Sequence, residues 1–403
     1  MNPPEPAEVA RAGERPVARR DPLAWAAHAS FLVYVVALTT SIAPMEIAGG
    51  LCVVLTLLWW VSGGGRWVRS PVDLPGLGWL AALVIASIFS LDPAGSFPRI
   101  VKGFMPAIVA VAASHTLDPV RGRRAIATLF GAACVVAVLG LAGWAMRGAS
   151  FEARDSGLVG HYMTFAGQLL LVVTVAAGVA LTAREPRWRW GALATVAVGV
   201  VALASTFTRS SWIGFVVSLL VLLGVKRPRW LIGLAVLVAL AFLFAPGVYR
   251  ERLDSMFDPT HPWNRERWLM WGAGLRMFRD HPLTGVGLQD LHPLYAVYKS
   301  PAATEMVGHL HNVIVMIAAA TGVVGLVAFV VLYASLGVAA TRGLRAQLAR
   351  GGVAAGVRLG VVACLAGFLA AGMFEWNFGD EELLHQLYTL VGIAWAARVW
   401  DGS

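Results

Sequence analysis

The stretch His309-Leu-His311-Asn312-Val-Ile-Val-Met-Ile-Ala-Ala-Ala-Thr321-Gly322-Val-Val-Gly325 combines a polar start with a long apolar run. The doublet His311-Asn312 opens the run, and Gly322 and Gly325 interrupt it. A polar side chain in lipid is costly without a partner, so polar groups at the edge of a membrane segment are candidates for function. The alternative is an interfacial histidine that only caps a helix near the headgroups. The rest of the chain decides between these two interpretations.

The composition of the chain excludes an ordinary soluble protein. Its 403 residues are 58% hydrophobic and only 14% charged, and the mean hydropathy is +0.69. These values are typical of a polytopic membrane protein. Three cysteines, Cys52, Cys134 and Cys364, lie far apart inside apolar runs and lack metal-ligand spacing. We therefore expect them to be packing residues.

Apolar runs predict an all-α fold with about twelve membrane spans, because one span needs about 20 apolar residues. The runs lie at residues 25–44, 47–62, 72–91, 97–115, 125–146, 162–183, 190–208, 211–225, 230–247, 311–341, 358–374 and 385–399. The polar residues 1–23 precede them and are expected to form a cytoplasmic tail. The remaining residues, 24–403, are expected to form one transmembrane domain.

The distribution of arginine and lysine predicts the orientation. The loop after 311–341 carries four arginines and no acid, so the positive-inside rule places it in the cytoplasm. The segment 311–341 then crosses the membrane once, and both termini are cytoplasmic. The polar loop 248–310, between spans 9 and 10, faces outward and brings His311 to the outer face. The net charge of +9 is explained by loops that contact anionic headgroups, and no nucleic-acid partner is needed.

A short turn between the seventh and eighth spans carries Arg209, Ser210 and Ser211. An arginine at membrane level needs an anionic partner, and its guanidinium is suited to bidentate binding of phosphate. The two hydroxyls add possible hydrogen bonds. The alternative is that Arg209 extends to a headgroup phosphate of the surrounding lipid.

The outer loop contains an expected amphipathic helix at 264–279. Its apolar side chains recur at helical spacing: Trp268, Trp271, Leu275 and Phe278. Arg265 lies at the start of this helix, where backbone N–H groups also favour an anion. Arg276 and Arg279 lie further along it, and we include them as supporting residues. The helix should end before Pro282.

His309 and His311 supply the chemistry for proton transfer. A neutral imidazole is a suitable general base at ambient pH. The two histidines would not share a face of a helix, and no carboxylate lies at a matching helical spacing, so we expect no metal site. Arginines for an anion and a histidine for a proton suit the attack of a hydroxyl on a lipid-linked glycosyl diphosphate. His311 would act on the acceptor, with Asn312 and His309 as supporting residues.

In this reaction Arg209 and Arg265 would neutralise the diphosphate leaving group, with Ser210 and Ser211 in support. Because arginines would take the place of a divalent ion, the reaction is expected to need no metal and no cofactor.

The spacing of His311-Asn312, nine residues and Gly322-x-x-Gly325 resembles the signature of bacterial O-antigen ligases. The stretches Asp280–Gly287 and Arg209–Trp212 resemble other segments of the O-antigen ligase and polymerase superfamily. The resemblance implies a GT-C type glycosyltransferase of the bacterial inner membrane. It would transfer O-antigen from undecaprenyl diphosphate to the lipid A–core oligosaccharide at the periplasmic face during lipopolysaccharide synthesis, with inversion and without metal.

The resemblance also implies residue roles. The essential histidine of the family corresponds to His311, and its outward arginines correspond to Arg209 and Arg265. The loop 248–310 becomes periplasmic in this interpretation. For recognition of the acceptor nothing matches the family, and the loop 147–161 offers three candidates. These are Arg147, Arg154 and Asp155.

Two other classes of function remain open at this point. An O-antigen polymerase or a protein O-oligosaccharyltransferase would share the donor and the site but use another acceptor. A flippase or other transporter of lipid-linked oligosaccharide should carry charged residues near the bilayer midplane. Lys102 is the only basic residue well within an expected span, so the distribution of charge favours an enzyme at the outer face.

Overall fold

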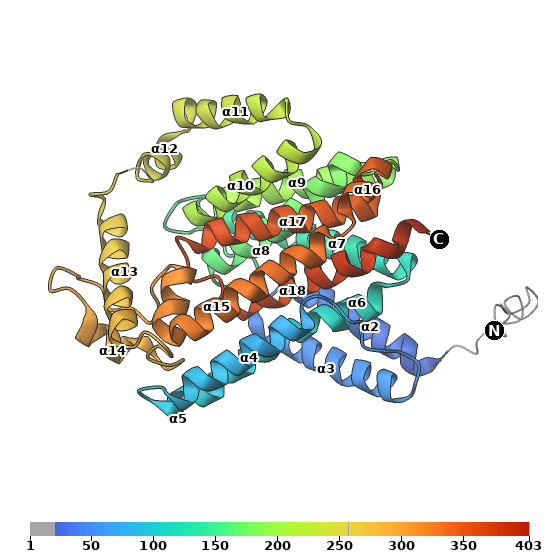
Figure 1. Cartoon of the computed structure of the whole chain (residues 1–403). Coiled ribbons are helices and arrows are strands. Elements are labelled where there is room, and N and C mark those ends of the chain that lie inside the picture. The colour runs from blue at the N-terminus through green and yellow to red at the C-terminus, as the bar shows by residue number, and fades with distance from the viewer. Residues whose placement is uncertain (1–20, 257, 403) are drawn as a thin grey trace, which may run out of the picture.

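The computed structural model describes residues 21–256 and 258–402, and these residues contain helices and no strands (Figure 1). Most of the expected tail 1–23 lies outside the described residues, and the first helix begins at Pro22. From Pro22 to Ser205 the helices are α2 (Pro22–Ala37), α3 (Ile42–Val61), α4 (Asp73–Ile88), α5 (Pro93–Ser96), η1 (Phe97–Ala107), α6 (Ile108–Thr116), α7 (Pro119–Met146), α8 (Tyr162–Thr182) and α9 (Pro186–Ser205).

The second half of the chain begins where α10 follows α9 after a short turn. Its helices are α10 (Arg209–Lys226), α11 (Trp230–Phe244), α12 (Gly247–Asp254), α13 (Pro262–Asp280), α14 (Leu291–Tyr298), α15 (Val313–Thr341), α16 (Leu344–Arg350), α17 (Val353–Gly372), α18 (Glu381–Ala396) and η2 (Ala397–Gly402). In Figure 1, α13 and α14 lie at one end of the bundle and α16 lies at the other.

The helices confirm a polytopic membrane protein. Among the described residues, 8 helices are long and apolar enough to cross a membrane, or up to 9 if the bent pair α11 and α12 is one span. Each expected span overlaps a helix, but α2, α4 and α18 have only 16 residues each. A helix of that length is about 24 Å long, shorter than the hydrocarbon core. The number of spans and their orientation therefore stay predictions.

Helices α8 and α17 form the centre of the bundle, because small residues let their backbones approach closely. A methyl group at Gly178 of α8 would lie 2.5 Å from the carbonyl oxygen of Gly356 in α17. About three turns further along α17, a methyl group at Gly214 of α10 would lie 2.6 Å from the carbonyl oxygen of Gly367. This packing fixes α10, and with it Arg209 at the start of α10, relative to α17.

Helix α15 is broken at Gly322, where the backbone has φ 62° and ψ −161°. The break frees the carbonyl groups of the preceding turn, and these need new donors inside a membrane protein. The loop after α13 supplies the donors, since Val286 N–H bonds to Ala319 O at 2.9 Å and Gly287 N–H bonds to Ala320 O at 2.9 Å. The pair Gly322 and Gly325 permits either a bend or a close helix contact, and the structure has the bend at Gly322.

The same loop fits closely against the break. A methyl group at Gly322 would collide with the carbonyl of Leu283, and one at Gly285 would collide with the backbone of Ala320. Both glycines also have positive φ, which L side chains rarely adopt. The stretches Asp280–Gly287 and Gly322–Gly325 therefore form one structural unit, which supports the start of α15.

Helix α13 confirms the expected helix in the outer loop, but it packs with a different face. Its buried side is formed by Met270, Ala273 and Met277, which contact the region of α15. Trp268 is 60% exposed and Leu275 is 56% exposed. Trp271 of the expected face does pack against this cluster, whereas Trp268 and Leu275 do not. Large exposed apolar side chains are common near a membrane surface, so their spacing does not identify the face that packs.

Candidate functional site

His311 lies in the turn that leads into α15, at the same end of the bundle as α13 (Figure 1). Its φ is +47°, a left-handed conformation that is uncommon outside glycine and often found at functional sites. Asn312 holds the turn in place. Its Oδ1 accepts from Val315 N–H at 3.0 Å as the N-cap of α15, and its Nδ2 donates to Met373 O at 2.9 Å. The turn is thus attached to the connection between α17 and α18.

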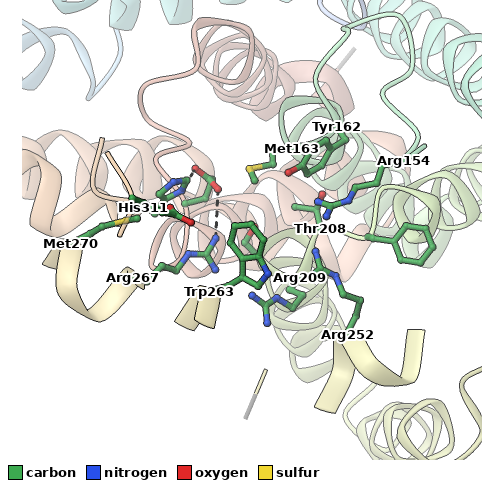
Figure 2. A pocket seen from close by; sticks show the side chains of 14 residues that line it. Arg154, Tyr162, Met163, Thr208, Arg209, Arg252, Trp263, Arg267, Met270 and His311 are labelled. Atoms are coloured by element: carbon green, nitrogen blue, oxygen red, sulfur yellow. Dashed lines mark hydrogen bonds and ion pairs between the residues drawn. The ribbon is translucent and has the colours of Figure 1, made fainter. Parts of the chain in front are cut away.

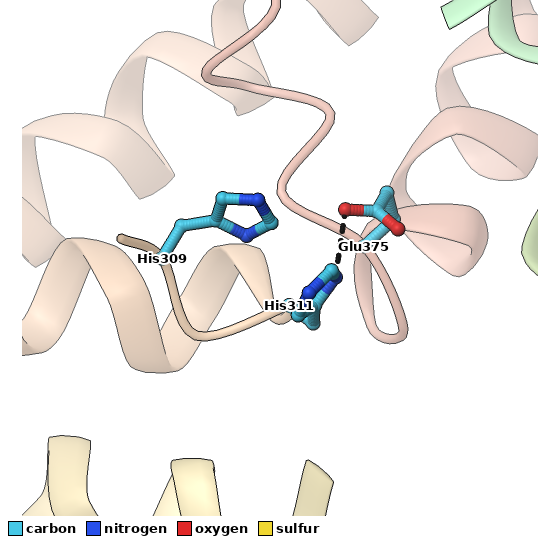
Figure 3. Close-up of side chains that lie close together, drawn as sticks. All are labelled: His309, His311 and Glu375. Carbon is cyan, nitrogen blue, oxygen red and sulfur yellow. Dashed lines mark hydrogen bonds and ion pairs between the residues drawn. The ribbon is translucent and has the colours of Figure 1, made fainter. Parts of the chain in front are cut away.

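That connection carries Glu375, whose carboxylate lies beside the imidazole (Figure 3). His311 Nδ1 lies 2.9 Å from Glu375 Oε1, and Trp376 N–H donates to the same oxygen at 2.9 Å. Arg267 of α13 forms an ion pair with Oε2 at 3.9 Å. Glu375 therefore links the start of α15 to helix α13.

The ionisation of Glu375 determines which nitrogen of the His311 ring faces it as a donor. Burial raises the pKa of Glu375, but the hydrogen bond from His311, the positive charge that both rings carry in acid and the hydrogen bond from Trp376 N–H outweigh burial and hold the pKa at about 2. An ionised carboxylate only accepts hydrogen bonds, so His311 Nδ1 is the donor. In a neutral imidazole the other nitrogen, Nε2, then carries the free lone pair. This arrangement can accept a proton from a substrate.

His309 packs against His311, with ring centroids 4.2 Å apart. Burial lowers the pKa of His309 to about 4, so its ring is neutral at ambient pH. Helical spacing predicts that both histidines lie on a helix, with no carboxylate at a matching position. The structure places them before the first turn of α15 and brings Glu375 next to them from 64 residues along the chain.

A cavity of about 170 Å³ opens beside His311 and Glu375 (Figure 2). Four arginines and one further glutamate complete its charged lining. They are Arg154, Arg209, Arg252, Arg267 and Glu305. Positive charge therefore exceeds negative charge on the cavity wall. A partly buried excess of arginine favours an anion with more than one negative charge.

Arg209 is the first residue of α10 and faces this cavity (Figure 2). Its guanidinium donates to Ser255 Oγ at 2.8 Å, Ser255 O at 3.1 Å and Asn264 Oδ1 at 3.4 Å. No carboxylate forms an ion pair with it among the described residues. These neutral acceptors hold the side chain in position and leave its charge uncompensated.

Aromatic rings position another arginine of the cavity. The guanidinium of Arg154 lies 3.9 Å from the ring centre of Phe151 and 4.3 Å from that of Tyr162. Arg252 lies over the same Phe151 ring at 4.3 Å. Cation–π contacts of this kind fix an arginine without neutralising it. Of the three acceptor candidates in 147–161, the structure thus brings Arg154 to the cavity.

The structure brings some expected site residues to the cavity and leaves others away from it. Ser210 lines the cavity, whereas Ser211 is buried in α10 and does not line it. Arg265 is exposed and lies outside the cavity. Arg267 lines the cavity, where Arg265 was expected. Two residues of a helix are about 200° apart around the axis, so a two-residue error selects the opposite face.

The other expected arginines of α13 have partners elsewhere. Arg276 donates to Tyr298 O at 3.0 Å and 2.6 Å and so ties α13 to the end of α14. Arg279 is exposed and lies 3.6 Å from Asp280. Asp155 is buried and accepts from Ser205 Oγ at 2.9 Å, which is a packing contact.

A second cavity, of about 290 Å³, meets the first at Arg209, Ser210 and Arg267. Its remaining lining is largely apolar: Ile213, Met256, Trp268, Trp271 and Phe374. The two shared arginines therefore stand between a polar cavity and an apolar one. A molecule with a polar end, an anionic centre and an apolar end would fit the two cavities, with its anionic centre at the two arginines.

The comparison with protein families agrees with the resemblance seen in the sequence. A family model described as O-antigen ligase matches residues 194–330. The matched region runs from α9 into α15 and contains Arg209, Arg267 and His311, while Arg154 and Glu375 lie outside it. A search of curated proteins found no match to the chain.

Proposed function

Residues 194–330 place this chain in the O-antigen ligase and polymerase superfamily, and on that premise we propose that it is an O-antigen ligase. The donor is O-antigen on undecaprenyl diphosphate, and the acceptor is the lipid A–core oligosaccharide. Transfer takes place at the periplasmic face of the bacterial inner membrane during lipopolysaccharide synthesis. The reaction proceeds with inversion and without a metal ion.

One observation supports this proposal above all. The His311–Glu375 pair and the uncompensated Arg209 line the same cavity. A base that is oriented by a carboxylate suits the removal of a hydroxyl proton. An arginine without a carboxylate partner suits a leaving group that gains negative charge.

The reaction assigns a role to each of these groups. The acceptor hydroxyl gives its proton to His311 Nε2 while its oxygen forms a bond to the anomeric carbon of the donor. The bond from that carbon to the diphosphate oxygen breaks on the opposite face, which inverts the configuration. Undecaprenyl diphosphate leaves with the bonding electrons, and Arg209 and Arg267 stabilise its charge. Glu375 stabilises the imidazolium until the proton passes to solvent.

The two cavities suit the two ends of the donor. The diphosphate would bind at Arg209 and Arg267, where the cavities meet. The polyprenyl chain would follow the apolar cavity beside Trp271 and Phe374 into the lipid. The sugar would occupy the cavity near His311, and Arg154 with Tyr162 would contact the acceptor.

A polymerase and a protein O-oligosaccharyltransferase would use the same donor side, so the test must identify the acceptor. We would delete the gene and analyse the surface glycan and the lipid carrier. Loss of a ligase should leave polymer on the carrier and a bare lipid A–core. A core bearing a single repeat unit would instead indicate a polymerase, and loss of glycan from protein alone would indicate the protein transferase.

A transporter is the remaining alternative. Lys102, the one basic residue expected well within a span, forms an ion pair with Glu381 at 3.2 Å and donates to Gly379 O at 2.8 Å. These contacts hold α18 against η1, which is a structural role. Transfer by the purified protein from donor to acceptor, both supplied in one micelle, would separate an enzyme from a flippase.

A further inference from the structure

Three side chains with metal-binding atoms meet at the start of α15 (Figure 3). One donor atom from each of His309, His311 and Glu375 lies within 4.8 Å of the other two. Two of these residues come from the turn before α15 and the third from the connection between α17 and α18. The packing of the bundle therefore assembles the group, which no local sequence motif contains.

The chemistry of these donors matches a particular class of ion. Two imidazole nitrogens and one carboxylate oxygen are a common ligand set for Zn²⁺, with bond lengths of about 2.0–2.2 Å. Two ligands of such an ion are about 3.3 Å apart in a tetrahedral site. His311 Nδ1 and Glu375 Oε1 are already 2.9 Å apart, and the donor atom of His309 lies within 4.8 Å of the donor atoms of both. Nitrogen ligands disfavour Mg²⁺ and Ca²⁺.

A second observation concerns His309 alone. Its Nδ1 atom is buried and has no hydrogen-bond partner among the described residues. Buried polar atoms in folded proteins normally have a partner, and an exception calls for an explanation. His311 and Glu375 are held by Asn312 and by the backbone of Trp376, so the site is preorganised next to this unpaired nitrogen.

We propose that His309, His311 and Glu375 bind a divalent transition-metal ion of the zinc type, and that this ion inhibits transfer. Inhibition rests on the proposed function, whereas ion binding does not. An ion on Nδ1 of His311 takes the lone pair of that nitrogen and moves the ring proton to Nε2. The nitrogen that faces the acceptor then donates a hydrogen bond and can no longer accept a proton. The ion also occupies the carboxylate that orients the ring.

Binding is tested on the purified full-length protein in detergent micelles after removal of metal. Co²⁺ titration by absorption spectroscopy and Zn²⁺ titration by calorimetry should each give one ion per chain. His309→Gln should weaken affinity by about 10- to 100-fold or more, the loss typical even of an outer-shell partner. Equal binding by wild type and His309→Gln, or no binding by wild type, would overturn the site.

The chain offers a matched control for this variant. His292 Nδ1 lies 2.9 Å from Asp290 Oδ1, which is a histidine–carboxylate pair without the third donor. His292→Gln should bind Co²⁺ like wild type, and a loss of affinity equal to that of His309→Gln would show non-specific binding.

A second measurement of ion binding needs no variant. Zn²⁺ should protect His311 of wild type from diethylpyrocarbonate but leave His292 reactive, and unchanged modification of His311 would also overturn the site.

Inhibition is tested in the transfer assay with Zn²⁺ or Mg²⁺ added. Zn²⁺ should inhibit wild type reversibly, Mg²⁺ should not, and His309→Gln should need about 10-fold more Zn²⁺ relative to its own Zn²⁺-free rate. Transfer that is insensitive to saturating Zn²⁺, or stimulated by it, would overturn the inhibition. Zn²⁺ binding by a protein that transfers nothing would refute the proposed function and leave the site intact.

Discussion

His311 Nδ1 lies 2.9 Å from Glu375 Oε1, although 64 residues separate the two in sequence. The carboxylate is ionised because its pKa is about 2, so it fixes the proton of the imidazole on Nδ1. The histidine therefore has a defined orientation and tautomer before any substrate binds.

Glu375→Gln should reduce kcat by about 100-fold, because an amide cannot stabilise the imidazolium that forms during proton transfer. The KM for the lipid-linked donor should stay close to that of wild type, since Glu375 acts through His311. Steady-state kinetics with purified protein measure both. A rise in KM at unchanged kcat would show that Glu375 serves only to bind substrate.

Arg209→Lys and Arg267→Lys should each lower kcat by about 100- to 1,000-fold, because lysine loses the bidentate contact with diphosphate. Arg265→Lys is the matched control on the same helix as Arg267, and its exposed side chain lies outside the cavity. It should transfer at nearly the wild-type rate. A defect in Arg265→Lys as large as that in Arg267→Lys would contradict the site described here.

Gly322→Ala should destabilise the protein by about 1–3 kcal/mol, because alanine is strained at φ 62° and meets the carbonyl of Leu283. Gly337→Ala is the control in the same helix, since a methyl group there meets no atom within 4 Å. The control should be neutral or slightly stabilising. Thermal unfolding in micelles compares the two, and equal Tm values would show that the break in α15 carries no strain.

Stability should also depend on pH through Asp380. Burial, and after it the charge of Glu375, raises the pKa of Asp380 from 3.8 to about 7. Between pH 3.8 and about 7, Asp380 is protonated in the folded state and ionised in the unfolded state. The free energy of unfolding therefore falls as the pH rises from about 4 to about 7. Asp380→Asn removes this ionisation and should flatten the loss. The Tm of wild type and variant at pH 5 and pH 8 tests this, and parallel pH curves would contradict it.

Part of this structure follows from sequence alone, because part of it is local. Hydropathy predicts the helices of the bundle, and the glycine pair predicts the bend in α15. The proline Pro282 predicts the end of α13, which the structure has at Asp280. Each of these features depends on a few neighbouring residues, so periodicity and backbone chemistry are sufficient to identify it.

The composition of the site is not local, and sequence reasoning missed much of it. Glu375 lies in the short connection between α17 and α18, which has the composition of a solvated loop. Only the packing of the bundle places its partly buried carboxylate beside His311. Arg267 and Arg265 are equivalent by composition, and only the rotation of α13 about its axis selects Arg267. Asp155 is the opposite case. Its carboxylate was expected near the substrate, but it accepts a hydrogen bond from Ser205 inside the bundle.

The proposed reaction uses no metal ion, which gives one more expected result. Removal of divalent ions with a chelator should not lower the transfer rate, because Arg209 and Arg267 stabilise the leaving group in the proposed mechanism. The measurement is the transfer rate before and after chelation of the purified protein. A rate that falls on chelation and recovers with Mg²⁺ or Mn²⁺ would contradict the arginine mechanism.

The most direct test of the central claim is the transfer assay on His311→Ala. The purified variant would receive O-antigen on undecaprenyl diphosphate together with lipid A–core, after its fold is checked by size-exclusion elution and Tm. We predict that it binds the donor like wild type and transfers no detectable glycan. Transfer at a rate close to that of wild type would contradict the role of His311 as the base.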